Sequence, residues 1–107
     1  MMAIEKVIGG GKVAVLVSPG LGAGWSTWAD NAEAAMFDPE VVAWVERGKP
    51  RDEFLEKEES WFERFGYLGG ADDLEIEWVT VGSGFYIEEY DGSETLRVIS
   101  PDRGNVA

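Results

Sequence analysis

The spacing of hydrophobic positions changes along the chain, and each spacing predicts a different kind of element. An apolar run in Lys12–Val17 is typical of a strand buried on both faces. Between residues 28 and 65, apolar positions recur at helical intervals. From Leu74 onward they alternate with polar ones, so Leu74, Ile76 and Trp78 are expected to point inward from a half-buried strand.

The helical stretch contains start and stop signals for three helices. The first is expected to begin near Thr27 and to end at Phe37. The second has Asp38 as its N-cap and a proline at its first position, and Gly48 is suited to the left-handed turn that ends a helix. The third covers residues 52–65. Its apolar side chains are predicted to share one buried face: Phe54, Leu55, Trp61, Phe62 and Phe65.

After the third helix, the pattern predicts a strand over Leu74–Val81 and then a hairpin that turns at Asp91–Gly92. The resulting order is β–α–α–α–β–β–β. We therefore predict an α+β fold in which a small, mainly antiparallel sheet of about four strands packs against helices. The first strand is expected near the centre of that sheet because both of its faces are apolar. Residues 1–107 are interpreted as a single domain.

The residue types missing from the chain narrow its chemistry. There is no cysteine and no histidine, so thiolate nucleophiles, imidazole acid–base catalysis and zinc sites of the usual type are excluded. The acidic pairs lack the spacing of a known calcium loop. These features favour a binding protein over an enzyme, and the sequence assigns no catalytic residue, no metal ligand and no cofactor.

The net charge of −12 is concentrated in one part of the chain. The span from Asp52 to Glu94 holds fourteen acids and two bases, whereas the remainder holds seven of each sign. Such a field repels nucleic acid and attracts cations or basic protein surfaces. It is equally typical of a face whose only role is to be solvated.

The segment "SPGLGAGWSTW" is the strongest candidate for a ligand site. Its glycines follow the pattern G-x-G-x-G, which matches neither the dinucleotide fingerprint nor the phosphate loop of NTPases. A strand, a glycine-rich loop and a helix start still present several free backbone N–H groups together, which is a general anion site. The alternative is a tight connection that only needs glycine. The candidate ligand-binding residues are Ser18, Gly20, Gly22, Gly24, Trp25, Ser26, Thr27 and Trp28.

The first functional hypothesis is therefore a protein that sequesters a small anionic ligand, such as a nucleotide, in this loop. The second is an acidic protein that imitates a polyanion and inhibits a basic protein. The carboxylates assigned to that partner surface lie on the third helix and the following strand: Glu53, Glu56, Glu59, Glu63, Glu75 and Glu77.

The segments "KVAVLVSPGLGAGWSTW", "MFDPEVVAWVERGK", "GADDLEIEWV" and "YDGSE" together resemble a group of small acidic proteins encoded by bacteriophages and prophages. The resemblance covers nearly the whole chain and is most specific in "SPGLGAGWSTW". It supplies no fold or site residues. It implies a context, because such phage proteins often disable host machinery or sequester a host signalling molecule.

The remaining expectations concern location and assembly. No apolar run approaches the roughly 18 residues of a membrane helix, and the N-terminus lacks the apolar core of a signal peptide. We therefore expect a cytoplasmic protein that binds neither a membrane nor nucleic acid directly. A domain with five Trp and five Phe in 107 residues could leave an apolar patch for a twofold partner to cover, so a homo-oligomer is one expectation, and the sequence leaves the oligomeric state open.

Overall fold

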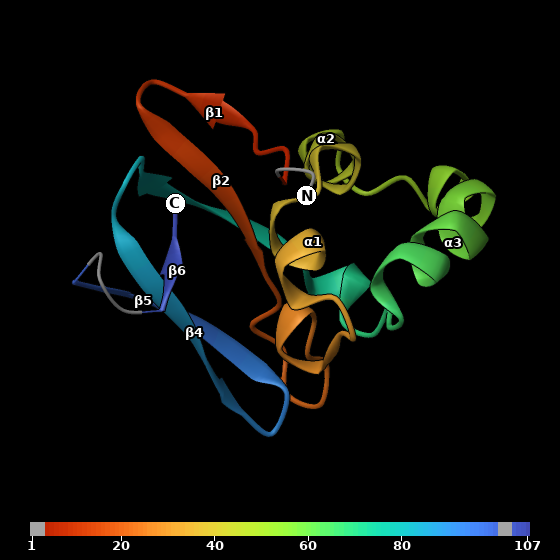
Figure 1. Ribbon diagram of the computed structural model, residues 1–107. Helices are drawn as coiled ribbons and strands as arrows, with labels where there is room; N and C mark the ends of the chain where they lie inside the picture. The colour runs from red at the N-terminus through yellow and green to blue at the C-terminus, as the bar shows by residue number, and fades with distance from the viewer. Residues whose placement is uncertain (1–3, 101–103) are drawn as a thin grey trace.

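The computed structural model describes residues 4–100 and 104–107 (Figure 1). The strands are β1 (Ile8–Gly9), β2 (Lys12–Val17), β3 (Glu75–Thr80), β4 (Gly84–Tyr90), β5 (Ser93–Ile99) and β6 (Asn105–Val106). The helices are α1 (Ala32–Phe37), α2 (Pro39–Glu46) and α3 (Arg51–Phe65), with short 3-10 helices η1 (Ser26–Trp28) and η2 (Ala71–Asp73). The structure is therefore an α+β fold, as the sequence predicts.

Strand β2 has the bounds that the sequence predicts and lies in the middle of a sheet. It pairs antiparallel with β1 on one side and with β3 on the other. Every residue of β2 after Lys12 is buried. Ala14 and Leu16 pack in the cluster formed with the helices, whereas Val13 and Val15 pack in the cluster formed with the second sheet. An apolar strand is needed here because both of its faces are covered.

The antiparallel strands are divided between two sheets of three strands, β1-β2-β3 and β5-β4-β6, where the sequence analysis placed them in one. The tight turn after β3 redirects the chain, and in this turn Gly82 has a φ of +87° and donates to the carbonyl of Ala107. The β4–β5 hairpin turns at Asp91–Gly92 as predicted. The molecule consequently has three layers: helices, the first sheet and the second sheet (Figure 1).

Most of the helix starts and ends that the sequence predicts are present in the structure. The Asp38 carboxylate accepts from the Val41 N–H at the start of α2, where Pro39 is the first residue. The third helix ends at Gly66, whose φ of +77° gives a left-handed cap. The first predicted helix is interrupted. Its early part is η1, and α1 begins only after Asn31, whose side chain accepts from the Ala34 N–H.

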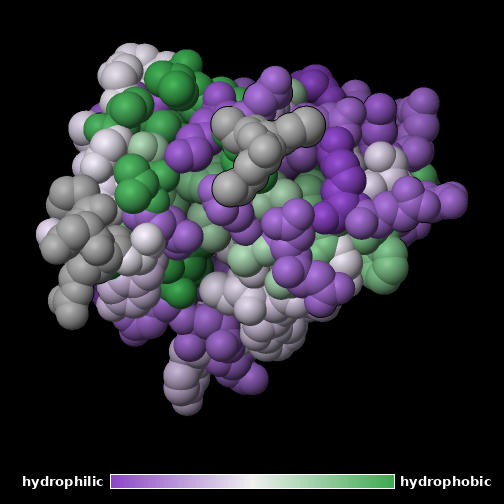
Figure 2. All heavy atoms as spheres, in the orientation of Figure 1, coloured by the Kyte–Doolittle hydropathy of each residue, from purple (hydrophilic) through white to green (hydrophobic). Residues whose placement is uncertain are grey.

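The side chains of Leu74, Ile76 and Trp78 were predicted to point inward, and this prediction is correct at the start of β3 but wrong at Trp78. Leu74 is buried and Ile76 is half-buried, but Trp78 is 41% exposed. Trp78 lies opposite Ala14 on the edge strand of the first sheet, and its ring rests beside Gly9 of the short strand β1. In Figure 2, hydrophobic side chains gather on the surface over β1 and β2, while hydrophilic ones dominate toward the helices.

Candidate functional site

The residues from Ser18 to Trp28, here called the Gly/Trp loop, connect β2 to η1 and contact the β4–β5 hairpin. The Gly22 N–H donates to the Asp91 carbonyl at 2.5 Å, and the Gly24 N–H donates to the Gly92 carbonyl at 2.7 Å. The loop is therefore joined through its backbone to the tip of a hairpin about seventy positions further along the chain.

The Glu94 carboxylate holds the loop in place by accepting hydrogen bonds from it. Glu94 is the second residue of β5. Glu94 is 2% exposed. Its oxygens accept from the backbone N–H groups of Ser18, Trp25 and Thr27 at 3.0, 2.9 and 3.1 Å. The Thr27 hydroxyl adds a fourth hydrogen bond at 2.5 Å. Glu94 also donates its own N–H to the Ser18 carbonyl. A buried carboxylate is stable in such a place because hydrogen-bond donors satisfy its oxygens.

The backbone N–H groups that the sequence assigned to anion binding therefore bind an anion of the same chain, the Glu94 carboxylate. Three of the backbone N–H groups expected to meet a ligand point instead at Glu94. Sequence reasoning missed this residue. Its only local signal is an acid directly after the hairpin turn, at a position whose strand neighbours on the same face, Leu96 and Val98, are apolar.

The glycines of the loop have packing roles as well as conformational ones. Gly22 and Gly24 have φ values of +75° and +67°, which favour glycine. A Cβ on Gly24 would lie 2.7 Å from the ring of Trp28, and one on Gly20 would collide with the Asp73 carboxylate. Gly24 is therefore favoured by its backbone conformation and by the Trp28 ring, independently of any ligand, whereas the exposed Asp73 side chain could shift to admit a Cβ at Gly20.

The two tryptophans of the loop differ in exposure. Trp25 is fully buried, donates from Nε1 to the Ala35 carbonyl at 2.8 Å, and meets Phe65 edge to face. Trp28 is 43% exposed and meets Tyr67 edge to face. Only Trp28 could therefore stack on a ligand. The buried Ser26 hydroxyl has no hydrogen-bond partner among the described residues.

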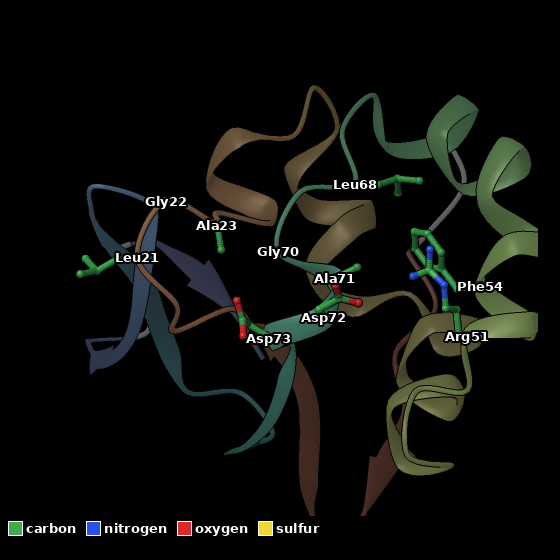
Figure 3. A pocket seen from close by; sticks show the side chains of 10 residues that line it. All are labelled: Leu21, Gly22, Ala23, Arg51, Phe54, Leu68, Gly70, Ala71, Asp72 and Asp73. Carbon is green, nitrogen blue, oxygen red and sulfur yellow. The ribbon is translucent and has the colours of Figure 1, made fainter.

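A pocket of about 350 Å³ lies on the outer side of the loop (Figure 3). Leu21 stands at one end of it and Arg51 of α3 at the other, with Asp72 and Asp73 of η2 between them. Two carboxylates and one guanidinium line this pocket. Its charge is therefore unfavourable for a phosphate or another anion of high charge.

The six carboxylates assigned to a partner surface fall into two separate groups. Glu56, Glu59 and Glu63 are exposed on α3, and Glu53 on the same helix binds the Arg47 guanidinium at 2.5 Å. The strand group, Glu75 and Glu77 of β3, is also exposed. Their partners in β2 belong to the face that meets the second sheet, whereas α3 packs over the opposite face. The two groups therefore do not form one surface.

The outer face of α3 carries apolar side chains that the sequence predicted to be buried. Leu55 and Phe62 are each 56% exposed. Trp61 and Phe65 are buried and Phe54 is half-buried, because these three fall on one narrow stripe that faces α2 and the first sheet. At 100° per residue, Leu55 and Phe62 lie about 80–100° away from that stripe and align with each other.

The ion pairs at the junction of α2 and α3 are partly shielded from solvent. The Trp61 indole N–H donates to Glu40 at 2.6 Å, and Lys57 and Arg64 lie within 3.3 Å of the same carboxylate. The hydrogen bond from Trp61 lowers the pKa of Glu40, with a further contribution from the two cations. Burial raises the pKa of Asp38 despite its hydrogen bond from Val41.

Other kinds of site find no support in the described residues. Within residues 4–100 and 104–107, no group of three or more acidic side chains is placed to hold a metal ion. No helix in that part of the chain has the length and apolarity needed to cross a membrane. Comparison with protein families, curated proteins and solved structures finds no match to this chain.

Proposed function

We propose that the protein is a non-enzymatic, cytoplasmic binding protein that occupies a basic surface on another protein with the outer face of α3. The observation that carries the proposal is the combination of exposed apolar and acidic side chains on one rigid helix. Leu55 and Phe62 are seven residues apart, so they stand two turns apart on the same side. Glu58 and Glu59 lie between them and are exposed.

The charges on this helix are available to a partner. Among the described residues, Glu56, Glu58, Glu59 and Glu63 form no ion pair. Apolar side chains at the centre of such a surface would contribute affinity by being buried. The surrounding carboxylates would orient a basic partner and speed its association. A host protein with a nucleic-acid-binding groove has the matching charge, and the phage-like context suggests inhibition as the result.

Binding of a small anion to the Gly/Trp loop stays a prediction, and the structure adds a condition for it. An anion that used the N–H groups of the Gly/Trp loop would have to displace Glu94, which accepts four hydrogen bonds there. An anion on the outer side of the loop would meet Asp72 and Asp73 beside Arg51. The α3 surface is favoured because it needs no rearrangement.

The test begins with proteins that the immobilised chain captures from bacterial lysate, followed by affinity measurements on each purified partner. Replacing Leu55 and Phe62 by Ala should weaken binding at least about tenfold, because the buried apolar contact is lost. A matched variant replaces the similarly exposed Ile8 and Val98 by Ala and should bind normally. Equal losses in both variants would contradict the assignment to α3.

The charge of the surface is tested in the same assay. Removing three carboxylates of α3 should weaken binding and flatten its dependence on salt between about 50 and 150 mM. Removing three exposed, unpaired carboxylates elsewhere should leave that dependence steep. Binding that salt does not affect would count against the proposal. The two variants are Glu56→Gln/Glu59→Gln/Glu63→Gln and the control Glu5→Gln/Glu33→Gln/Glu46→Gln.

A further inference from the structure

Strand β3 forms an edge of the first sheet that no strand covers among the described residues. The Val81 N–H donates to the Gly11 carbonyl, which defines this pair as hydrogen-bonded. Hydrogen-bonded pairs alternate along an antiparallel ladder. The backbone groups of Glu75, Glu77 and Val79 therefore bond to β2. Those at positions 76, 78 and 80 point outward from the sheet.

The outward-pointing backbone groups are accessible over most of the strand. Four of the six residues of β3 are exposed. The Lys49 ammonium donates to the Leu74 carbonyl at 3.2 Å, just before the strand begins. Beyond that point, the Thr80 carbonyl accepts from the Ser83 N–H at 3.0 Å, where the chain turns after the strand. Within the part of the chain that the structure describes, no hydrogen bond reaches the outward groups of Ile76 and Trp78 or the Thr80 N–H. Unpaired N–H and C=O groups of this kind are a template for an added strand.

The two faces of the edge offer different side-chain environments. On one face, Glu75 and Glu77 line a groove of about 400 Å³ that Thr95 of the second sheet closes from the other side. Both carboxylates are exposed and neither has an ion pair among the described residues. On the other face, Ile76 is half-buried and Trp78 is 41% exposed. One face therefore suits basic side chains and the other suits apolar ones.

We infer that β3 binds an extended segment of a basic partner protein, in which basic and apolar residues alternate, as an added antiparallel strand. The basic side chains would enter the groove beside Glu75 and Glu77, and the apolar ones would lie against Ile76 and Trp78. Backbone hydrogen bonds supply affinity in this mode, and the alternating side chains supply specificity. A second copy of this chain fits poorly, because its own β3 would bring the same carboxylates to the edge.

This site is distinct from the α3 surface, so either can fail while the other holds. It also competes with a simpler explanation, in which Glu75 and Glu77 only prevent edge-to-edge aggregation. The probe that separates the two is a labelled peptide of alternating lysine and valine, about eight residues long so that it spans the strand. The residues opposite Ile76, Trp78 and Thr80 would be its valines.

Two modified peptides of equal charge provide the decisive comparison. N-methylation of the valines removes the N–H groups that would bond to the β3 edge, whereas N-methylation of the lysines removes N–H groups that face solvent. We expect the first peptide to lose binding and the second to keep it. We also expect the bound peptide to slow amide hydrogen exchange at Ile76, Trp78 and Thr80. Equal binding of both peptides, or unchanged exchange at these amides, would overturn the inference.

A charge variant tests the face on which the lysines lie. Replacing Glu75 and Glu77 by Gln should weaken binding of the unmodified peptide about tenfold through the loss of two cross-strand ion pairs. The control replaces Glu56 and Glu59 of α3, which lie across the first sheet, and should change the affinity by less than about twofold. If the α3 variant weakens peptide binding as much, the peptide is attracted by net charge alone and the inference fails.

Discussion

Glu94 is a carboxylate in a position where a charge is rarely found, and its surroundings explain how it is stabilised. Ser18, Trp25 and Thr27 direct backbone N–H groups at it from a loop that precedes it by about seventy positions. Each hydrogen bond to an ionised group contributes more than a neutral one. The glycines let the loop curve around the carboxylate, so the residues around Glu94 act as one unit.

Glu40 offers a test of the electrostatics at the junction of α2 and α3. Its pKa is lowered from the ordinary value of 4.5, mainly by the hydrogen bond from Trp61. A lowered carboxylate pKa stabilises the fold above the unfolded value, and this contribution is lost as the pH falls through the folded one. We expect Glu40→Gln to be less stable than the native chain by about 1 kcal/mol or less near pH 7, because the side chain is 41% exposed.

Urea denaturation at about pH 7 and about pH 3 measures this difference, which should shrink at the lower pH as Glu40 is protonated. Burial, the main cause of the raised pKa of Asp38, acts in the opposite direction and is present in both proteins. Glu46→Gln on the same helix is the control, since Glu46 has no ion pair among the described residues. A difference that is unchanged at the lower pH would refute the ionic contribution.

The β4–β5 hairpin depends on glycine for its contact with the Gly/Trp loop. Gly92 has a φ of +84°, and a Cβ there would lie 2.7 Å from the backbone of Gly22. Gly82 has a similar φ of +87°, but a Cβ there would meet nothing within 4 Å. The two positions share a positive φ and differ in the space around them.

Alanine at each position separates these effects. Gly82→Ala should lower the free energy of unfolding by about 1–2 kcal/mol, the cost of a left-handed non-glycine residue. Gly92→Ala should cost at least about 2 kcal/mol more, because the hairpin must move away from the loop. Denaturant midpoints measure the free energies, and faster amide exchange at Gly22 and Gly24 would locate the damage. Equal costs at both positions would mean that the contact is unimportant.

Secondary structure could be predicted where local signals decide it. The β2 run, the proline-capped start of α2, the third helix and the Asp91–Gly92 turn are all present. The first predicted helix is interrupted because the backbone extends at Ala29, and the Asp30 and Asn31 N–H groups then bond to the Phe65 carbonyl. That contact is with the end of α3, so no local pattern near residue 30 indicates it.

The sequence predicted the anion-binding N–H groups of the candidate site, but it did not predict that Glu94 of the same chain would bind to them. The Gly/Trp loop does present N–H groups to an anion, but Glu94 reaches it only because the second sheet folds back over the first. Burial on α3 was also misjudged. Leu55 and Phe62 have the same hydrophobicity as core residues, and only the angle at which α3 meets its neighbours leaves them exposed. Sequence spacing does not give that angle.

The distribution of charge over the molecule follows from this arrangement. Glu94 is buried among donors, Glu53 and Glu88 are paired with Arg47 and Arg97, and most other carboxylates between Asp52 and Asp91 point to solvent. The loop is closed internally by its own anion while the acidic helix and strand face outward. The acidic and apolar side chains exposed on α3 are the ones that the proposed function assigns to a basic partner.

The first measurement is a titration of the native chain with inorganic phosphate, acetate and ATP. The readout is the chemical shift of the Ser18, Trp25 and Thr27 amide resonances. We expect no saturable shift, because the Glu94 carboxylate already holds these N–H groups. In Glu94→Gly, acetate should shift the same resonances and raise the denaturation midpoint, since it can occupy the vacated position. Saturable shifts of these amides in the native chain would contradict internal closure of the loop and restore it as a ligand site.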